Sequence, residues 1–324
     1  MRIAITGAGG FVGQVLTQQL LADDRYHLVL VDRNLPPSLR HTRITRVEGD
    51  LVQSSLVSHV ADQAVDVLIH LATVPGGTAE ADRDLSRRIN LNASLDLFDA
   101  VAAAGPAADR VPRIIYASTI AIFSLGLNER IDDDTPPAPF LSYAAHKLMC
   151  ETYLADLHRR GEVEAISLRL PAILARPNGQ GLTSAFMSEI FRAPVDRPFV
   201  CPTSEDARIW AMSVDQACIN LQHAIHMPVG LLPNSRAVTL PVLRFSMGEL
   251  ATALGTNIRF EPDPLIGQNF TSQPILDASA AEAAGFRNDG NLQSLILRVQ
   301  ARFPALNDEV LNTVARQQVG AVLG

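Results

Sequence analysis

The sequence contains few cysteines and lacks a long apolar run. Its three cysteines, Cys150, Cys201 and Cys218, are an odd number without a C-x-x-C pair. This argues against a disulfide framework or a thiolate zinc site and is typical of a reducing compartment. Apolar stretches such as residues 164–174 are interrupted by charge and are too short to cross a bilayer. The chain begins with a strand-like segment, residues 2–6, in place of a signal peptide. These absences predict a cytoplasmic protein without a membrane segment.

Charged residues are scarce, and lysine is nearly absent. Charged side chains make up 19% of the 324 residues and hydrophobic ones 47%, which predicts a folded chain with a large core and roughly two domains. The net charge of −7 and the lack of a basic block argue against nucleic-acid binding and favour small polar or anionic ligands. Of the 27 basic residues, Lys147 is the one lysine, and all the others are arginine.

Short β-branched runs alternate with helical patterns in the first half of the chain. The expected strands are residues 3–6, 27–32, 43–48, 65–72, 113–118 and 164–170. The expected helices are residues 11–22, 51–62, 80–104 and 141–160, and residues 125–140 resemble a surface loop. Continuous apolar strands are typical of parallel sheets that are covered on both faces. The pattern therefore predicts an α/β fold, a Rossmann-type doubly wound parallel sheet with helices on both faces.

A glycine-rich turn follows the first expected strand. Gly7, Gly10 and Gly13 stand where a strand-to-helix turn brings the backbone and free helix amides close to a dinucleotide pyrophosphate. Asp32 ends the next strand about 20 residues on, the spacing of a carboxylate that binds the adenosine ribose. We expect NAD as cofactor, with NADP tolerated because Arg33 can approach a 2′-phosphate. The expected contacts of the turn are Gly7, Gly10, Phe11, Val12 and Gly13.

The alternating pattern weakens after Pro171. We expect residues 1–171 to form the NAD-binding Rossmann domain, joined by about residues 207–230. Residues 172–324 then form mainly a smaller α/β substrate-binding region. The elements expected after Pro171 are helices at 211–226 and 247–254 and strands at 237–240 and 257–261.

The single lysine follows a tyrosine by four positions on an expected helix. Tyr143 and Lys147 therefore share one helix face. A phenol with its ordinary pKa of about 10 is a poor base at neutral pH, but an adjacent ammonium favours the ionised form. Tyr143 is therefore a candidate proton acceptor. Ser118 or Thr119, at the end of a strand, is a candidate to orient a substrate alcohol, unless that hydroxyl only caps the following turn.

Together these motifs resemble the extended short-chain dehydrogenases/reductases over the whole chain. The residues that carry the resemblance are Thr6–Gly13, Asp32, Gly49–Leu51, His70–Ala72, Asn90, Ser118, Thr119, Tyr143, Lys147 and Leu168–Pro171. The resemblance implies that Thr119, Tyr143 and Lys147 are catalytic. It implies further cofactor contacts, with Asn92 as an alternative to Asn90. These contacts are Asp50, Leu51, Leu71, Ala72, Asn90, Tyr143, Lys147 and Pro171.

Segments around the expected cleft narrow the resemblance to dehydrogenases of small sugar acids. They are residues 75–82, 142–151, 168–173, 176–177 and 208–210. The resemblance implies oxidation of the C2 hydroxyl of a four-carbon sugar acid to the 2-keto acid. One arginine should bind the carboxylate, because a guanidinium forms a bidentate pair with it. The expected substrate residues are Thr119, Tyr143, Gly77, Arg176 and Arg208.

Other functions stay open at this stage. A nucleotide-sugar 4-epimerase is the main alternative, and a non-catalytic dinucleotide-sensing protein is a distant one because both Tyr143 and Lys147 are present. A dehydratase is disfavoured, because Ile120 and Ala121 stand where such enzymes of the superfamily carry Asp-Glu. No metal site is expected. Analogy with relatives allows a homodimer.

Overall fold

The computed structural model describes residues 1–105, 110–123, 129–174, 176, 184–193, 197–264, 266 and 273–302. Residues 125–128 of the expected loop, and Pro177, lie outside these ranges. The described chain divides into two compact units. Unit 1 comprises Met1–Pro171, Asp215–Val242 and Pro274–Asn288. Unit 2 comprises Ala172–Val214, Leu243–Gln273 and the chain from Asp289 on.

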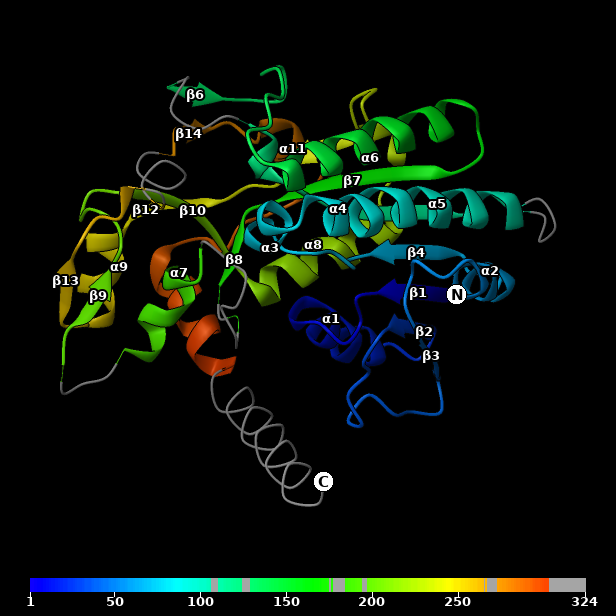
Figure 1. The fold of residues 1–324 in the computed structure, drawn as a ribbon, viewed down its shortest axis with the longest axis horizontal. Coiled ribbons are helices and arrows are strands. Elements are labelled where there is room, and N and C mark those ends of the chain that lie inside the picture. Colours follow the sequence, from blue (N-terminus) through cyan, green and yellow to red (C-terminus); the bar gives the residue numbers. More distant parts are fainter. Residues whose placement is uncertain are drawn as a thin grey trace. The chain divides into compact units, whose positions relative to one another are not determined.

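Unit 1 is built on a seven-stranded parallel sheet in the order β11-β7-β5-β4-β1-β2-β3 (Figure 1). The strands are β1 (Arg2–Thr6), β2 (His27–Asp32), β3 (Ile44–Glu48), β4 (Val67–His70), β5 (Arg113–Thr119), β7 (Glu164–Leu170) and β11 (Ala237–Thr239). The order changes direction between β1 and β4, which is the switch point where open α/β sheets bind ligands. The predicted Rossmann-type parallel sheet is therefore confirmed.

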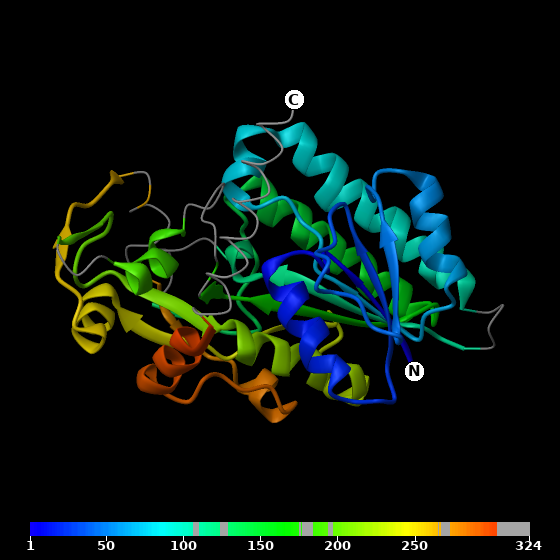
Figure 2. The same ribbon diagram turned by 90° about the horizontal axis from the view of Figure 1, so that it is seen from below.

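Helices cover both faces of this sheet. α2, α5 and α6 lie on one face, and α1 and α8 lie on the other (Figure 2). Gln19 of α1 donates to Asp215 of α8 at 3.1 Å, which ties the second pair together. The helices of unit 1 are α1 (Phe11–Leu21), α2 (Ser54–Asp62), α3 (Gly76–Ala81), α4 (Arg83–Ser86), α5 (Ala93–Ala104), α6 (Ser142–Arg159), α8 (Val214–His226) and α11 (Ser279–Ala283). Short elements are the π-helix η1 (Arg87–Asn92), the 3₁₀ turns η3 (Ile120–Ile122) and η5 (Val229–Leu231), and the paired strands β6 (Arg130–Ile131) and β14 (Ile275–Leu276).

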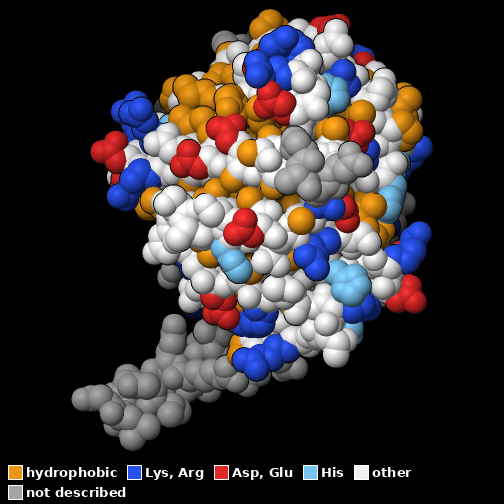
Figure 3. Space-filling model, turned by 90° about the vertical axis from the view of Figure 1, so that its right-hand side faces the viewer, with side chains coloured by type: hydrophobic (Ala, Val, Ile, Leu, Met, Phe, Trp, Pro, Cys, Tyr) orange, Lys and Arg blue, Asp and Glu red, His pale blue; other side chains and the backbone are white. Residues whose placement is uncertain are grey.

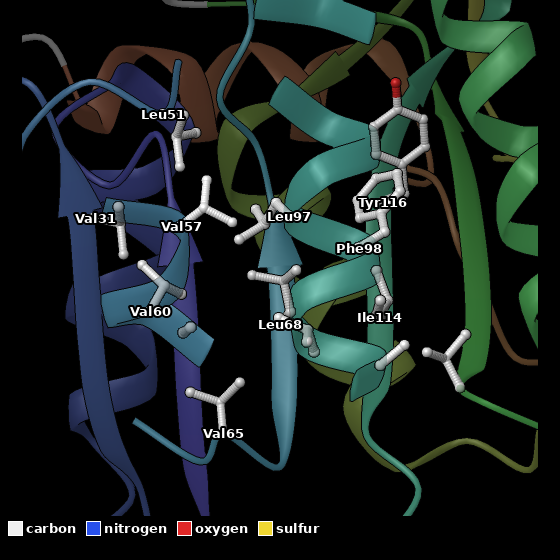
Figure 4. Close-up of a cluster of buried hydrophobic side chains, with 14 of the residues drawn as sticks. Val31, Leu51, Val57, Val60, Val65, Leu68, Leu97, Phe98, Ile114 and Tyr116 are labelled. Atoms are coloured by element: carbon white, nitrogen blue, oxygen red, sulfur yellow. The ribbon is translucent and has the colours of Figure 1, made fainter. Parts of the chain in front are cut away.

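A core of interlocking apolar side chains fixes α2 and α5 over the strands. Leu68 of β4 and Ile114 of β5 belong to one buried cluster with Val60 of α2 and with Leu97 and Phe98 of α5 (Figure 4). All five side chains are fully buried. Burying a side chain of this size contributes about 1.5–3 kcal/mol. The layer of helices therefore has a defined position on the carboxyl half of the sheet, where the candidate site lies.

One expected helix is divided in the structure. The prediction of a single helix over residues 80–104 was wrong, because α3 ends at Ala81 and Asp82 has a non-helical backbone. The Asp82 side chain instead caps α4 by accepting a hydrogen bond from Leu85 N at 2.8 Å. Asp favours this capping position over a helix interior. The π-helix η1 then interrupts the α-helical pattern, which is typical of functional sites.

Two expectations for the second half of the chain also differ from the structure. The strand expected at 237–240 belongs to the main sheet, where β11 pairs with β7, and not to the second region. Residues 211–213, expected to be helical, continue a strand that begins at Arg208. The helix begins only at Val214, because the buried Asp289 accepts hydrogen bonds from the backbone N–H and hydroxyl of Ser213.

Unit 2 is the smaller α/β part. Its strands are β8 (Ala172–Leu174), β9 (Phe199–Cys201), β10 (Arg208–Ser213), β12 (Leu243–Ser246) and β13 (Ile258–Phe260), and its short helices are α7 (Phe186–Glu189), η4 (Ile190–Arg192) and α9 (Met247–Leu254). The strand order is β12-β10-β8, and β13 pairs with β9. Ser246 and Glu249 form a capping box that starts α9 directly after β12.

One face of the described chain is mixed in charge. Basic and acidic side chains are interspersed on the face shown in Figure 3, in keeping with the lack of a basic block in the sequence. None of the helices in the described ranges has the length and apolar character needed to cross a membrane.

Candidate active site

The glycine turn after β1 is too crowded for side chains. Gly7 has a φ of +70°, a left-handed conformation that favours glycine. A Cβ on Gly7 would lie 2.7 Å from the backbone nitrogen of Ala72, and one on Gly13 would lie 2.3 Å from the Gly7 oxygen. The turn is closed by a hydrogen bond from Gly10 N to Gly7 O at 3.0 Å. It therefore presents bare backbone and touches the loop that follows β4.

The start of α1 can accept an anion. Gly10 is the N-cap residue and provides no side-chain hydrogen bond, and the first turn of α1 carries no acidic residue. The first amides of a helix have no partner within it, and the helix dipole adds positive potential there. Phe11 and Val12, in this first turn, are half-buried. The turn and the helix start thus fit the pyrophosphate of a dinucleotide.

Asp32 ends β2 and faces the same turn. Its Oδ2 accepts a hydrogen bond from Gly9 N at 2.9 Å, and its Oδ1 accepts one from Asn34 N at 3.2 Å. The carboxylate is half-buried and keeps acceptor capacity for ligand hydroxyls. Arg33 is exposed beside it. Arg46 of β3 holds the loop after Asp32 by donating to three of its carbonyls.

The other expected cofactor residues follow β3, β4 and β7. Asp50 is half-buried, and Leu51 is packed in the apolar core of unit 1. Leu71 and Ala72 are half-buried in the loop that touches the glycine turn. Pro171 is buried directly after β7. These residues are thus partly accessible or stand at strand ends. Leu51 is the exception and contributes mainly to the core.

Tyr143 and Lys147 lie on the first two turns of α6. Lys147 is 2% exposed, and its Nζ donates to Ala117 O at 2.8 Å. The Nζ also lies 5.7 Å from the ring centroid of Tyr143 and 4.6 Å from that of Tyr116. Burial lowers the pKa of Lys147 from 10.5 to about 8, because desolvation disfavours the charged form. An ammonium has three N–H donors, so Lys147 can also bind ligand hydroxyls.

The two hydroxyls at the end of β5 have different partners. Ser118 is buried and donates to the carboxylate of Glu151. Thr119 is 8% exposed and accepts a hydrogen bond from Ala121 N at 3.1 Å, which caps η3. Its hydroxyl proton stays available for a ligand oxygen. The geometry therefore favours Thr119 over Ser118 as the residue that meets a substrate, although Thr119 also serves as the turn cap.

A buried ion pair, which sequence reasoning missed, anchors α6 to β7. Arg169 Nη2 lies 2.9 Å from Glu151 Oε2, and the two side chains are only 7% and 3% exposed. The guanidinium also lies 5.4 Å from the ring centroid of Phe123. Removing one member of a buried pair typically costs 3–5 kcal/mol, about the stability of a marginal domain. The pair therefore holds the helix that carries Tyr143 against the sheet.

The π-helix η1 directs Asn90 into the loop after β4. Its Oδ1 accepts hydrogen bonds from Val74 N at 2.7 Å and from the Thr73 hydroxyl at 3.1 Å. Its Nδ2 donates to Val74 O at 3.0 Å and to the Ser86 hydroxyl at 3.1 Å. Asn90 is 1% exposed, whereas Asn92 is exposed. Asn90 is thus the asparagine that supports the loop from within.

His70 connects three elements below the site. Its Nδ1 lies 2.6 Å from the hydroxyl of Thr6 on β1, and its Nε2 lies 2.9 Å from that of Ser94 on α5. The imidazole also stacks on Tyr116 at a centroid distance of 5.7 Å. Burial, with a smaller effect of the Lys147 charge, lowers the pKa of His70 from 6.5 to about 3. The ring is therefore neutral at physiological pH and acts as a structural link.

Comparison with known proteins identifies the family of this chain. The model of the NAD dependent epimerase/dehydratase family matches residues 3–223. The chain belongs to this family. D-erythronate dehydrogenase from Haemophilus influenzae is 32% identical over 311 residues, which are 91% of this chain and 98% of the relative. The D-erythronate dehydrogenase from Cupriavidus necator is 30% identical over 91% of this chain and 97% of its own length.

Solved structures show the same fold. The nucleoside-diphosphate-sugar epimerase from Agrobacterium tumefaciens is 31% identical, with a TM-score of 0.83 over 91% of this chain and 92% of that one. L-threonine dehydrogenase from Clostridium difficile, 21% identical with a TM-score of 0.81, shares the fold. The resemblance to the extended short-chain dehydrogenases/reductases is thus confirmed, and this family member is a dehydrogenase with a nicotinamide dinucleotide as cofactor.

The expected substrate residues are divided between the two units. Gly77 lies in the first turn of α3 in unit 1. Arg208, on β10 of unit 2, is paired with Glu249 at an Nη1–Oε2 distance of 2.9 Å. Arg176, also in unit 2, accepts a hydrogen bond at its carbonyl from Arg192 Nη2 at 2.6 Å. Arg208 therefore already has a carboxylate partner within its own unit.

No three metal-ligating side chains come together in the described ranges. His223 and His226 have i, i+3 spacing on α8, but each has its own protein partner. His223 Nε2 lies 2.8 Å from Ala284 O, and His226 Nε2 lies 2.6 Å from the Tyr26 hydroxyl.

We predict that His70 lowers the stability of the protein in mild acid. The pKa of His70 in the folded chain is about 3, below the ordinary 6.5, so the unfolded chain takes up the proton first as the pH falls. The stability that neutral His70 contributes is complete above pH 6.5 and is lost progressively between pH 6.5 and 3. At pH 4.5 the loss is about 2–3 kcal/mol.

Urea unfolding at pH 7 and pH 4.5 tests this for the wild type and for His70→Gln, whose amide does not titrate. Between pH 7 and pH 4.5, His70→Gln should lose about 2–3 kcal/mol less stability than the wild type. Equal losses in both proteins would contradict the assignment, since the remaining acid sensitivity comes from carboxylates common to both.

Proposed function

We propose that the protein oxidises the C2 hydroxyl of a small sugar acid, D-erythronate or a close four-carbon aldonate, to the 2-keto acid with NAD. The observation that carries the proposal is the placement of Tyr143 beside the buried ammonium of Lys147 on α6. Two relatives named D-erythronate dehydrogenase, covered almost end to end, support the choice of substrate.

The residues of unit 1 are suited to hold the cofactor. A bound nicotinamide dinucleotide would supply the acceptor for the hydride that leaves C2 of the substrate. The crowded glycine turn and the uncapped start of α1 would bind the pyrophosphate, and Asp32 would accept hydrogen bonds from the adenosine ribose. Lys147, with one of its three N–H donors on Ala117 O, would donate to the nicotinamide ribose.

Tyr143 performs the proton transfer in this proposal. As phenolate it accepts the proton of the C2 hydroxyl at Oη, while Thr119 donates a hydrogen bond to the same substrate oxygen. The ammonium of Lys147 favours the phenolate by charge. Tyr143 also lies in the first turn of α6, where the helix dipole favours negative charge and the turn itself carries no acidic residue. Loss of the proton from oxygen and of the hydride from carbon leaves the carbonyl at C2.

Which arginine binds the substrate carboxylate stays a prediction from the sequence. Arg176 and Arg208 are the candidates, because a guanidinium fork matches a carboxylate. Arg208 would have to exchange Glu249 for the substrate.

A second function has one specific observation in its favour. The 31% identical structure from Agrobacterium tumefaciens is described as a nucleoside-diphosphate-sugar epimerase. Nucleotide-sugar 4-epimerisation is therefore the alternative that the substrate test must include.

We predict that purified protein reduces NAD with D-erythronate or a related four-carbon aldonate. The same preparation should not interconvert UDP-glucose and UDP-galactose. The test is a panel of aldonates and UDP-sugars, with NAD reduction followed by nicotinamide absorbance and epimerisation by chromatography. Epimerisation without aldonate oxidation would replace the proposal by the alternative.

We predict that Tyr143→Phe lowers turnover by about 10²–10⁴-fold, the range for a lost acid–base group, and leaves NAD binding nearly intact. The phenyl ring keeps the packing and removes only the proton acceptor. Tyr153→Phe is the matched control. Tyr153 lies on the same helix, and its hydroxyl donates a hydrogen bond to Asp99 at 2.6 Å, away from the proposed proton transfer. Steady-state kinetics and calorimetric NAD binding measure both effects. Wild-type turnover in Tyr143→Phe would remove Tyr143 from the mechanism.

We predict a preference for NAD over NADP that depends on Asp32. Its carboxylate accepts ribose hydrogen bonds and repels a 2′-phosphate, while the exposed Arg33 permits some use of NADP. In Asp32→Gly, kcat/KM with NAD should fall, and that with NADP should hold or rise. Asp32→Asn is the control, because it keeps an acceptor for Gly9 N while it removes the charge. A wild type that favours NADP, or a glycine variant that still prefers NAD, would exclude this role.

A further inference from the structure

Tyr116 is a buried tyrosine whose hydroxyl is unsatisfied among the described residues. It is fully buried on β5, and its hydroxyl lacks a hydrogen-bond partner among the described residues. Its ring stacks on His70 with an interplanar angle of 13° and meets the edge of Phe98 at a centroid distance of 5.6 Å. Figure 4 shows the rings of Tyr116 and Phe98 together at one end of the apolar cluster. What Tyr116 contributes is therefore its ring.

The ammonium of Lys147 lies against this ring, although the side chain is almost fully buried. Its Nζ is 4.6 Å from the Tyr116 centroid, and among the described residues it donates one hydrogen bond, to Ala117 O. Burying an unpaired ammonium is costly, while the face of an aromatic ring within about 6 Å attracts a cation. Tyr143, the other ring within that range, is farther away at 5.7 Å.

We propose that Tyr116 is a positioning residue whose ring face keeps the buried Lys147 charged and in place beside Tyr143 by a cation–π interaction. The contact is present in the protein without cofactor. Its role in catalysis rests on the proposed function. The ring below this position suits lysine better than arginine. A compact ammonium can approach the face of the ring while its other N–H groups point to a ligand.

Other titratable groups lie near Lys147, and of these Cys150 and Glu151 raise its pKa by charge, against the larger effect of burial. His70 below Tyr116 is neutral, because burial lowers its pKa to about 3. Cys150 on α6 is buried, and burial raises its pKa. Glu151 is shared with Arg169 and with the Ser118 hydroxyl, so its charge is not dedicated to Lys147. Of the two rings that lie near the ammonium, Tyr116 is the closer.

The single lysine makes a direct test possible. Protein labelled with ¹³Cε-lysine has one lysine resonance, that of Lys147, and its pH titration gives the pKa without cofactor or substrate. We expect a pKa of about 8 in the wild type and nearly the same value in Tyr116→Phe, which keeps the ring. In Tyr116→Leu the pKa should be lower by about 1, the equivalent of one cation–π contact.

Fluorinated phenylalanines at position 116 separate the ring charge from packing, because they keep the shape of Tyr116→Phe. The pKa of Lys147 should fall stepwise from phenylalanine to the 4-fluoro, 3,5-difluoro and 3,4,5-trifluoro analogues, since fluorine withdraws charge from the ring face. A pKa that does not respond to fluorination would overturn the proposal. This series also decides the matter if Tyr116→Leu fails to fold.

Kinetics then connect the contact to the reaction. In Tyr116→Leu the alkaline decline of kcat/KM for NAD should begin about one pH unit lower than in Tyr116→Phe, because the ammonium is lost earlier. An NMR response in a protein that oxidises no aldonate would overturn the proposed function and leave the cation–π contact established. Aldonate oxidation without a change in the lysine pKa would support the proposed function and overturn the cation–π contact.

Discussion

The candidate site depends on the burial of one ammonium, that of Lys147, between α6 and the sheet. Lys147 must lie close enough to β5 to donate to Ala117 O, and this distance sets how closely α6 approaches the sheet. The buried pair of Glu151 and Arg169 holds the next turns of the same helix against β7. At the helix start, Glu80 of α3 accepts a hydrogen bond from the backbone N–H of Ser142 at 2.6 Å. Tyr143 is positioned by these contacts together, since no single one defines its place.

Neutral polar side chains connect the loops around the carboxyl edge of the sheet. His70 joins β1, β4 and α5 through hydroxyl groups, and Asn90 holds the backbone of the loop after β4. Because the glycine turn touches this loop at Ala72, a change in either network reaches the expected pyrophosphate position. The π-helical backbone of η1 places Asn90 there and accounts for the break in regular helix at this point.

The contrast between arginine and lysine in this chain has a structural basis. Arg113 pairs with Glu164 and donates to three carbonyls at the end of α8, and Arg43 donates to three carbonyls as well. A planar fork with five N–H donors can satisfy several acceptors at the rim of a sheet. The position below Tyr143 offers one carbonyl and the face of a ring, and a compact ammonium suits such surroundings. The composition therefore reflects two different tasks for positive charge.

The sequence by itself determined the features that depend on near neighbours in the chain. The parallel-strand pattern, the glycine turn that leads into α1, and the spacing of Tyr143 and Lys147 all follow from local backbone preference and helix periodicity. Local patterns failed where the outcome depended on distant partners. Asp82 breaks an apparent helix, β11 joins the sheet beside β7, and Ser213 stays in a strand because Asp289 binds it. Only the tertiary structure shows that Ser118 bonds Glu151 whereas Thr119 caps η3, and that Asn90 is buried whereas Asn92 is exposed. The contact of Tyr116 with Lys147 likewise exists only once α6 has packed on β5, because no spacing within the sequence encodes which ring lies beneath a buried charge.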